Sequence, residues 1–452
     1  MITQAFLDKY DTRVPRYTSY PTAPHFSPAV TPQTYAGWLQ ALPAEAPLSL
    51  YLHVPFCEEL CLYCGCNTSV VRHDSPRIAY ANTMVREIEL AAGILGAPKR
   101  LVTHLHWGGG TPTALPAASL TKLMDHIRAA FTLAPDAEIA IELDPRNLSA
   151  DRLKALHEIG INRASLGVQD FDPAVQRAVG RIQSFETTAK VAQSLRNQGI
   201  QNLNLDLMYG LPYQTETSVT ATAFKALELK PDRIAVFGYA HVPWMKRHQK
   251  LMPESQLPNP LARFAQREAI AAVLLSEGYQ AIGLDHFALP TDSLSIAATQ
   301  KTLHRNFQGY TTDAAPALLG FGASSISSLP QGYAQNETSV PTYRAAVAEG
   351  FLPIHHGVAL TADDILRRDI IQTLMCDFEI DLIDTAMAHH ADPAQLLAAA
   401  PRLEILRKDG LISWNGRHIT VTRAGQPLVR SIAAIFDAYL TQNGAQRHAQ
   451  AV

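Results

Sequence analysis

The stretch Leu48-Ser-Leu-Tyr-Leu-His-Val-Pro-Phe-Cys57-Glu-Glu-Leu-Cys61-Leu-Tyr-Cys64 joins a short apolar run to a loop with three cysteines. Residues 48–54 have the length and composition of a buried β-strand. Similar runs recur up to about residue 285, and a longer segment with helical period follows each of them. This alternation predicts an α/β fold in which successive βα units build a parallel sheet.

The alternation contains six such units, which fit an incomplete (β/α)6 TIM-like barrel better than a closed eight-stranded one. The strands are expected at residues 48–54, 102–107, 138–143, 163–168, 202–208 and 233–238. The helices are expected near residues 77–95, 117–131, 149–159, 184–198, 216–229 and 261–277.

Four segments are predicted along the chain. Residues 1–47, rich in Pro, Thr and Tyr, form an ordered N-terminal arm, and residues 48–290 form the partial barrel. Residues 291–360 form a connecting segment that we expect to cover the substrate. Residues 361–452 form a mostly helical C-terminal domain with a winged-helix-like end, because Asn415-Gly416 predicts a hairpin between two helices.

Composition excludes several classes of protein. The 452 residues exceed what one hydrophobic core usually holds, and the formal charge of −3 provides no general attraction to nucleic acid or to an anionic membrane. No apolar stretch approaches the roughly 18 residues of a membrane span, and the N-terminus has no secretory h-region, so we expect a cytoplasmic protein. Four of the five cysteines lie between Cys57 and Cys66, which is unlike a disulfide framework.

The cysteine loop predicts a metal centre. Three thiolates with the spacing of Cys57, Cys61 and Cys64 can bind three irons of a [4Fe-4S] cluster and leave the fourth iron without a protein ligand. An open iron can chelate S-adenosylmethionine and cleave it to a 5′-deoxyadenosyl radical. Two alternatives are a structural zinc site that also uses Cys66 and a dithiol redox pair at Cys61-x-x-Cys64.

The position of this loop favours the cluster. Active sites of parallel βα barrels form at the carboxyl ends of the strands, and the loop follows the first strand there. The other strand ends are also distinctive, because glycines or polar residues follow each of them. They are Trp107-Gly-Gly-Gly-Thr-Pro112, Glu142 with Asp144, Gln169-Asp170, Asp206 and Tyr239-Ala240.

The cysteine loop and Gly108-Gly-Gly-Thr-Pro112 resemble the radical S-adenosylmethionine superfamily. Within it, further segments resemble the oxygen-independent coproporphyrinogen III oxidases (coproporphyrinogen dehydrogenases). These segments are Pro15-Arg-Tyr-Thr-Ser-Tyr-Pro-Thr22, Cys64-Gly-Cys-Asn67, Gly167-Val-Gln-Asp-Phe171, Asp206-Leu-Met-Tyr-Gly-Leu-Pro212, Asp285-His-Phe-Ala288 and Leu303-His-Arg-Asn-Phe-Gln-Gly-Tyr-Thr-Thr312.

That resemblance implies a radical oxidoreductase of haem biosynthesis. Such an enzyme converts two propionate side chains of coproporphyrinogen III to vinyl groups and yields protoporphyrinogen IX. It implies a [4Fe-4S] cluster, two molecules of S-adenosylmethionine, and an electron donor such as a flavodoxin or ferredoxin. We expect a monomer with no nucleic-acid partner.

The resemblance also implies residue roles. Cys57, Cys61 and Cys64 would bind the cluster and, with Tyr51 and Glu142, form the catalytic set. The first S-adenosylmethionine site would comprise Tyr51, Gly109, Glu142 and Ile326. The second would comprise Tyr63, Gly110, Thr111, Gln169, Arg181, Asp206 and Ala240.

A few further residues have predicted roles. The substrate carboxylates are expected to meet Arg13, Arg16 and Arg305. Cys66 is assigned no cluster role, and a structural or substrate-proximal one is expected instead. Cys376 lies in an apolar helical stretch and is expected to be buried and inert.

Two other functions compete with this interpretation. A sister family of haem-binding chaperones keeps the three-cysteine loop but lacks the arm motif and the Gly-Cys pair after Cys64, both of which are present here. The basic residues of the C-terminal hairpin region could instead bind nucleic acid, but Glu404, Asp409 and Asp437 interrupt that patch. The enzyme is therefore the favoured hypothesis.

Overall fold

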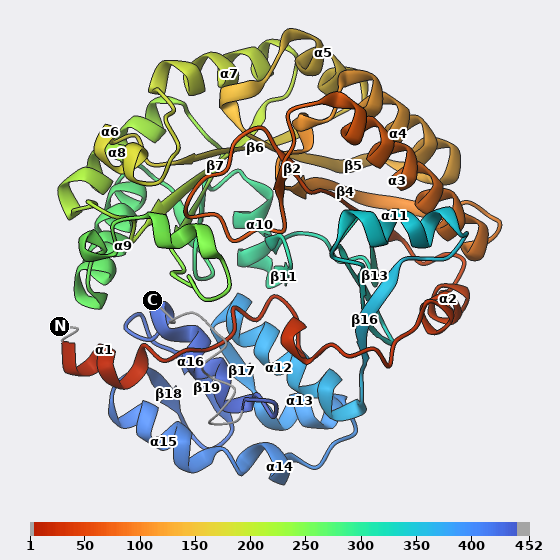
Figure 1. Cartoon of the computed structure of the whole chain (residues 1–452). Helices are drawn as coiled ribbons and strands as arrows, with labels where there is room; N and C mark the ends of the chain where they lie inside the picture. The colour runs from red at the N-terminus through yellow and green to blue at the C-terminus, as the bar shows by residue number, and fades with distance from the viewer. Residues whose placement is uncertain (1–3, 441–452) are drawn as a thin grey trace.

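The structure, a computed structural model, describes residues 4–440. Within them a twelve-stranded sheet has the order β16-β15-β14-β13-β1-β4-β5-β6-β7-β8-β10-β9 (Figure 1). The seven strands from β13 to β8 pair in parallel, and both flanks are antiparallel. Because β16 and β9 do not pair with each other, the barrel is incomplete.

The parallel strands include all six that the sequence predicted. They are β1 Leu48–Val54, β4 Leu101–Gly109, β5 Thr132–Leu143, β6 Arg163–Gln169, β7 Asn202–Tyr209 and β8 Arg233–Gly238. The seventh, β13 Ala317–Phe321, pairs with β1 and was not predicted. No helical segment follows it. Instead the chain continues into antiparallel β14 Ile326–Leu329, β15 Gly332–Asn336 and β16 Ile354–Ala359, so the alternating pattern gave no signal there.

Helices cover the outer face of the parallel strands, as Figure 1 shows. They are α3 Asp74–Leu95, α4 Ala117–Ala130, α5 Ala150–Glu158, α6 Pro173–Ala178, α7 Phe185–Asn197, α8 Glu216–Glu228 and α9 Pro260–Ser276. Ser149 caps α5 as predicted, because its hydroxyl accepts a hydrogen bond from the backbone of Arg152.

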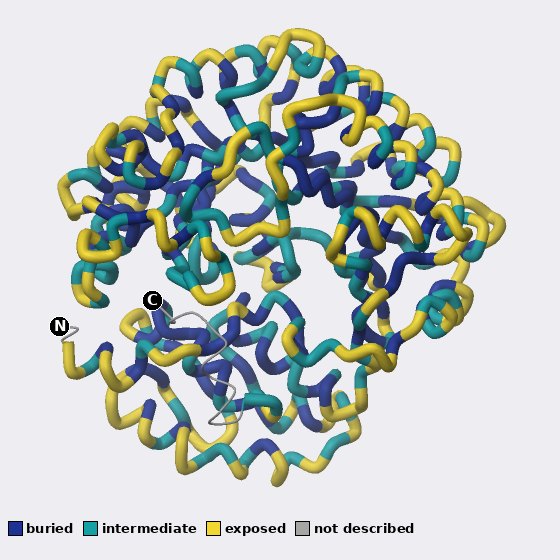
Figure 2. Tube along the Cα trace, in the orientation of Figure 1, coloured by how far each residue is buried: buried dark blue, intermediate teal, exposed yellow. Residues whose placement is uncertain are grey.

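The strands alternate between an apolar outer face and a polar inner face. In β7, Leu203, Leu205 and Leu207 are buried against the helices, whereas Asn204 and Asp206 point into the barrel. One hydrophobic core runs between the sheet and its helices, and Figure 2 shows the buried strands inside the exposed helical layer. Polar side chains therefore line the inside of the barrel.

The remaining elements flank the barrel. The antiparallel edge strands are β9 Gln280–Ile282 and β10 His286–Ala288, and two small ribbons are formed by β2 Phe56–Cys57 with β3 Ser69–Val70 and by β11 His304–Asn306 with β12 Gly309–Thr311. The helices are α1 Gln4–Tyr10, α2 Pro32–Gln40, α10 Ser293–Gln300 and α11 Val340–Ala348.

The C-terminal residues form a second core. Its elements are α12 Ala362–Asp377, β17 Glu379–Asp381, α13 Leu382–Ala388, α14 Pro393–Leu397, α15 Ala400–Lys408, β18 Ile412–Trp414, β19 His418–Val421 and α16 Val429–Ala433. Tyr10, Val14, Tyr17 and Tyr20 of the arm are buried in this core. In Figure 1 the arm runs along the boundary between the barrel and these residues. The division into four domains stays a prediction.

A buried charge cluster closes the end of the barrel away from the cysteine loop. Arg163 and Arg233 begin β6 and β8, and both reach Asp292, which caps α10. The Arg233 Nε–Asp292 Oδ1 distance is 2.6 Å, the Arg163 Nη1–Asp292 Oδ2 distance is 3.4 Å, and Asp292 has a side chain only 1 % exposed. Glu138 also accepts from Arg163, at 2.9 Å.

Replacing Asp292 by Asn should lower the free energy of unfolding by about 3 kcal/mol, because the buried guanidinium groups of Arg163 and Arg233 then lose the carboxylate that both pair with. Chemical denaturation measures this loss. The matched control is Asp363→Asn, which breaks the half-exposed Arg367–Asp363 pair on α12 and should cost about 0.5 kcal/mol. Equal losses in the two variants would contradict this account of the cluster.

Candidate active site

The cysteine loop lies at the carboxyl end of β1, and each of its three predicted ligands accepts a hydrogen bond. The Thr68 hydroxyl donates to Cys57 Sγ at 3.3 Å, and Arg181 Nη1 donates to Cys61 Sγ at 3.4 Å. The backbone N–H of Cys66 donates to Cys64 Sγ, also at 3.4 Å. Donors directed at sulfur favour the thiolate, which is the form that binds metals.

The thiols differ in acidity. A hydrogen bond from the Cys66 thiol lowers the pKa of Cys64 to about 6. Burial raises the pKa of Cys57, although the hydroxyls of Thr68 and Thr111 offset part of this. Burial also raises the pKa of Cys376 to about 12, which agrees with its predicted inert, buried state.

A second loop, between β8 and α9, holds the cysteine loop from outside. Lys246 Nζ donates to the carbonyl of Cys66 at 2.9 Å, and His248 Nε2 donates to the carbonyl of Cys64 at 2.8 Å. Gln249, which is buried, donates to the carbonyl of Tyr63 at 3.0 Å. Three side chains of this loop thus fix three backbone carbonyls of the cysteine loop.

The glycine run at the end of β4 contacts the cysteine loop closely. Gly110 N donates to the carbonyl of Val54 at 2.9 Å, and Thr111 N donates to the carbonyl of Phe56 at 2.8 Å. A Cβ atom on Gly110 would lie 2.5 Å from Thr68 Oγ1 and 2.7 Å from that Phe56 carbonyl oxygen. A side chain at position 110 would therefore push the cysteine loop out of place.

These elements surround a cavity of about 510 Å³, large enough for a small-molecule ligand. It brings together twelve of the fourteen predicted site residues: Cys57, Cys61, Tyr63, Cys64, Gly109, Gly110, Thr111, Glu142, Gln169, Arg181, Asp206 and Ala240. Tyr51 and Ile326 do not line it. Tyr51 is a direct neighbour of the cavity, because a Cβ on Gly108 would meet both its ring and the Glu142 carboxylate. Ile326 lies farther away, on β14, beside the Gly320 that pairs with Tyr51.

Glu142 is oriented by two donors. His106 Nε2 donates to its Oε1 at 3.1 Å, and the backbone N–H of Gly109 lies 3.3 Å from its Oε2. The His106 ring stacks on Tyr51, with ring centroids 5.9 Å apart. This leaves the carboxylate fixed at the cavity wall with room for a further donor.

Tyr51 is held by a chain of hydrogen bonds. His53 Nε2 lies 3.1 Å from the carbonyl oxygen of Asn67, which can only accept, so Nε2 carries the proton. Burial lowers the pKa of His53, which keeps its ring neutral. Its unprotonated Nδ1 then accepts from the Tyr51 hydroxyl at 3.0 Å.

An ion network stands beside Cys61. Asp144 accepts from Arg146 at 2.7 Å and from Arg181 at 3.2 Å, and Arg146 Nη2 lies 3.6 Å from Cys61 Sγ. Arg181 also donates to the carbonyl of Gly167 at 2.6 Å. Both guanidinium groups are thus positioned to support negative charge on the Cys61 sulfur.

Asp206 lies deeper in the barrel. It accepts from Ser165 Oγ at 3.0 Å and from Asn204 Nδ2 at 2.8 Å. Burial, reinforced by the nearby charge of Glu142, raises the pKa of Asp206 to about 6. A carboxyl group with a raised pKa in a cavity is a common mark of a functional residue.

Comparison with known proteins agrees with this geometry. A family model described as the radical SAM superfamily matches residues 51–226, and one described as the HemN C-terminal domain matches residues 360–428. An oxygen-independent coproporphyrinogen III oxidase from Bradyrhizobium diazoefficiens is 52% identical over 442 residues, which are 98% of each chain. The chain belongs to the oxygen-independent coproporphyrinogen III oxidases.

Other members of the family are similar over nearly the whole length. The oxygen-independent coproporphyrinogen III oxidase of Escherichia coli K12 is 42% identical over 443 residues, covering 97% of this chain and 95% of its own. A solved coproporphyrinogen III oxidase structure from Escherichia coli superposes with a TM-score of 0.90 at 40% identity and covers 97% of this chain and 99% of its own. The incomplete barrel predicted from the sequence is confirmed by this match.

Membership in the oxygen-independent coproporphyrinogen III oxidases implies an iron–sulfur cluster and S-adenosylmethionine, and the cysteine loop fits the cluster. Three thiols on one loop each have a donor at sulfur. Within residues 4–440, no three His, Cys, Asp or Glu side chains gather as ligands of a single metal ion. A cluster does not need such a group, because each cysteine binds a different iron.

Sequence reasoning missed several residues of the site. His53 and His106 face into the barrel and alternate with buried apolar residues of β1 and β4, and that alternation could have revealed them. Arg146 and Gln249 gave no signal, because only the folded chain brings them beside the cysteine loop. No helix within residues 4–440 has the length and apolarity of a membrane span.

Gly110→Ala should disrupt the cluster site, since its methyl group would collide with Thr68 and the Phe56 backbone. We expect less than about half of the wild-type iron after anaerobic reconstitution, measured by iron assay and visible absorption. Gly65→Ala, in the cysteine loop itself, is the control, because its Cβ would meet nothing within 4 Å. Normal iron content in the Gly110 variant would show that the close approach is not required.

The raised pKa of Asp206 predicts a pH-dependent cost to stability. The folded state holds this proton between about pH 4 and pH 6, so its contribution to the free energy of unfolding falls as pH rises through that window, by up to roughly 3 kcal/mol. Asp206→Asn should remove this decrease in denaturation experiments across the window. Asp151→Asn on the exposed surface of α5 should not, and an unchanged slope in the Asp206 variant would refute the assignment.

Proposed function

We propose that this chain oxidatively decarboxylates two propionate side chains of coproporphyrinogen III to vinyl groups and so produces protoporphyrinogen IX. The observation behind this proposal is the convergence of the three cysteines, the glycine run, Glu142 and Asp206 on one cavity. The 52% identity to a coproporphyrinogen III oxidase over nearly all of the chain supports the substrate. The same similarity disfavours the haem-binding chaperone.

Cys57, Cys61 and Cys64 would hold the cluster as thiolates. When bound, a [4Fe-4S] cluster with one open iron supplies the electron that cleaves S-adenosylmethionine and yields a 5′-deoxyadenosyl radical. The donors from Thr68, Arg181 and the Cys66 backbone stabilise the negative charge of the three sulfurs. Cys66 serves here through its N–H and its thiol, which both contact Cys64, in keeping with a structural role.

The first S-adenosylmethionine would bind beside the cysteines, at Glu142, Gly109 and the adjacent Tyr51. The Glu142 carboxylate can accept from an ammonium or a ribose hydroxyl group, and His106 and Gly109 already hold it in place. Ile326 belongs to this set by resemblance. Its backbone lies beside Gly320, which pairs with Tyr51.

A second S-adenosylmethionine would bind across the same cavity, at Tyr63, Gly110, Thr111, Gln169, Arg181, Asp206 and Ala240. Arg181 can pair with a carboxylate, and Asp206 can accept from a hydroxyl group. These residues line one cavity together with the cysteine loop. Two radicals are needed because two propionates react.

Each decarboxylation has a simple balance. One hydrogen atom leaves the β-carbon of a propionate and joins the 5′-deoxyadenosyl group, and then one CO₂ and one electron leave as the vinyl group forms. A β-hydrogen of a propionate is not acidic, so the side-chain bases of the cavity cannot remove it usefully. This explains why the site needs a radical and not a stronger base.

An electron donor must supply the reducing electrons, and we propose a small acidic carrier such as a flavodoxin or ferredoxin. The loop between β8 and α9, which contacts the cysteine loop, presents Lys246, Arg247 and Lys250 at the surface. These basic residues suit an acidic partner. A cytoplasmic location and a monomeric state stay predictions of the sequence.

Anaerobic reconstitution with iron and sulfide, followed by S-adenosylmethionine, dithionite and coproporphyrinogen III, tests the proposal. We expect protoporphyrinogen IX and two 5′-deoxyadenosine molecules per product molecule. Cys61→Ala should abolish both the cluster and the products, while Cys376→Ala, whose thiol lies outside the cavity, should retain them. Deoxyadenosine without porphyrin turnover would refute the assigned substrate, and turnover by the Cys61 variant would refute the assigned cluster.

A further inference from the structure

A second cavity adjoins the first, and its wall is unusually rich in arginine. This arginine cleft, of about 100 Å³, is lined by Arg13, Arg16, Arg263, Arg267, Arg305 and Arg430 together with aromatic and backbone groups. Among the described residues that line it, Asp285 is the only acidic one. The cleft therefore has a large excess of positive charge over negative charge.

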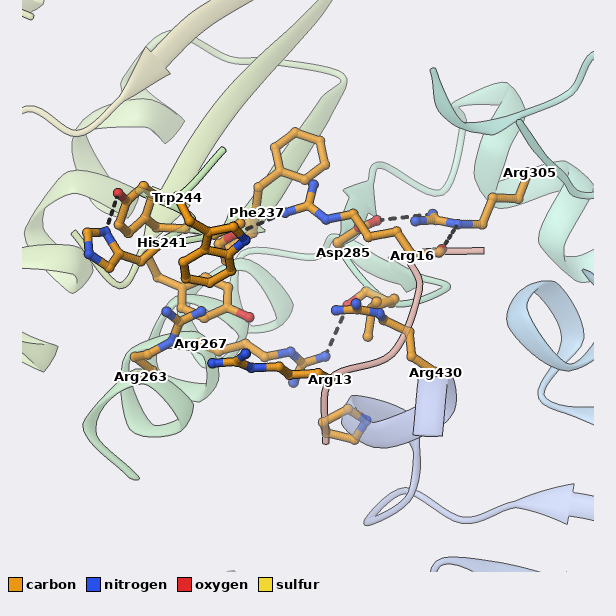
Figure 3. Close-up of a pocket in the computed structure, with 17 residues that line it drawn as sticks. Arg13, Arg16, Phe237, His241, Trp244, Arg263, Arg267, Asp285, Arg305 and Arg430 are labelled. Carbon is orange, nitrogen blue, oxygen red and sulfur yellow. Dashed lines mark hydrogen bonds and ion pairs between the residues drawn. The ribbon is translucent and has the colours of Figure 1, made fainter. Parts of the chain in front are cut away.

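The guanidinium groups come from four separate segments of the chain. Arg13 and Arg16 belong to the N-terminal arm, Arg263 and Arg267 lie one turn apart on α9, Arg305 lies on β11, and Arg430 lies on α16. Figure 3 shows side chains from the arm, α9 and α16 turned toward one another. Because like charges repel, such convergence costs free energy unless an anion offsets it.

Two of the arginines are occupied in holding the arm. Arg430 Nε donates to the carbonyl of Pro15 at 2.9 Å, and Arg305 Nε donates to the carbonyl of Arg16 at 3.4 Å. Arg305 also pairs with Asp285 at 3.7 Å and stacks over Tyr310. These contacts make Arg305 a positioning residue for the arm, and its predicted contact with the substrate stays a prediction.

The arm thus presents Arg13 and Arg16 to the cleft. The Arg16 side chain is exposed within the cleft and donates only to the carbonyl of Gly238, at 3.3 Å. Partial desolvation lowers the pKa of Arg16, and the positive charges of Arg305 and Arg263 lower it further. The Arg13 guanidinium lies over the half-exposed Trp244, 5.4 Å from its ring centroid.

Glycine residues make room for Arg263 on the opposite wall. A Cβ on Gly210 would lie 3.2 Å from the Arg263 guanidinium carbon, and a Cβ on Gly238 would lie 3.3 Å from its Nη2. The guanidinium also lies 6.0 Å from the ring centroid of Tyr209. Because Gly210 and Gly238 carry no side chains, the Arg263 guanidinium has room at the cleft.

The cleft opens onto the cavity that holds the cysteines. Arg16 lines both, and the two cavities share the wall from Phe237 to Ala240. A cleft of about 100 Å³ is too small for a tetrapyrrole ring but suits carboxylate groups at its edge. A ligand whose ring lies in the larger cavity could therefore extend its acidic side chains into the cleft.

We propose that Arg13, Arg16 and Arg263 bind the carboxylates of the two side chains that do not react, and thereby orient the tetrapyrrole ring in the larger cavity. This inference rests on the proposed function. Guanidinium groups bind carboxylates through paired hydrogen bonds, which fix direction as well as charge. Holding one edge of the ring directs the opposite propionates toward the cysteine loop.

Binding of two porphyrins to the cluster-reconstituted protein tests the proposal. Mesoporphyrin IX keeps only the two propionates that do not react, and its dimethyl ester has the same ring without free carboxylates; both can be titrated anaerobically by fluorescence. Arg16→Gln and Arg263→Gln should each weaken mesoporphyrin IX binding at least about tenfold. Binding of the dimethyl ester should weaken less than about threefold.

Two further variants separate charge recognition from structural damage. Arg16→Lys keeps the charge but loses the paired geometry, so its loss should lie between wild type and Arg16→Gln. Arg423→Gln, an exposed arginine outside both cavities, should bind both porphyrins as wild type does. Iron content and thermal melting of every variant are measured alongside.

Three results would overturn the proposal: unchanged mesoporphyrin IX affinity, equal losses for mesoporphyrin IX and its dimethyl ester, or weaker S-adenosylmethionine binding in the Gln variants. The last would assign the cleft to the carboxylate of S-adenosylmethionine. Failure of wild-type protein to convert coproporphyrinogen III would refute the proposed function instead. The two failures are therefore distinguishable.

Discussion

The close approach of two backbone segments, the glycine run of β4 and the cysteine loop of β1, is the contact on which the site depends. Parallel pairing sets Val54 opposite Gly109, so both segments leave the sheet at the same level. Gly110 and Thr111 then bond to the carbonyls of Val54 and Phe56 with no side chain between them. The loop that offers three sulfurs is thus held to the strand that faces Glu142.

Charge inside the barrel is arranged in two layers. At the closed end, Arg163 and Arg233 are offset by Asp292, and the cluster serves the fold. At the open end, Asp206 has a raised pKa, and the arginine cleft has one carboxylate on its wall. The charges of the closed end offset one another within the chain, whereas the positive charge of the arginine cleft exceeds the negative charge on its wall.

Local patterns predicted the parallel strands and most of the cavity wall. Strands such as β7 were predictable because apolar residues recur along each of them. Asp206 was assigned to the site because of its position in the β7 segment. Strand β13 was missed because antiparallel β14, and not a helix, follows it, which breaks the βα alternation. Arg263 and Arg430 were also missed, since an arginine on a helix usually faces solvent and only tertiary packing brings these two to the cleft.

The contacts between the arm and the C-terminal core constrain the order in which parts of the protein fold. Arg430 donates a hydrogen bond to the carbonyl of Pro15, which lies 415 residues earlier in the chain. On the ribosome the arm emerges well before Arg430 is synthesised, so Arg13 and Arg16 take their places only after α16 has been made. The barrel and its cysteine loop can form before that, which separates assembly of the metal centre from completion of the acid-binding cleft. A truncated chain would thus keep a place for iron while lacking the surface that recognises what the radical should attack.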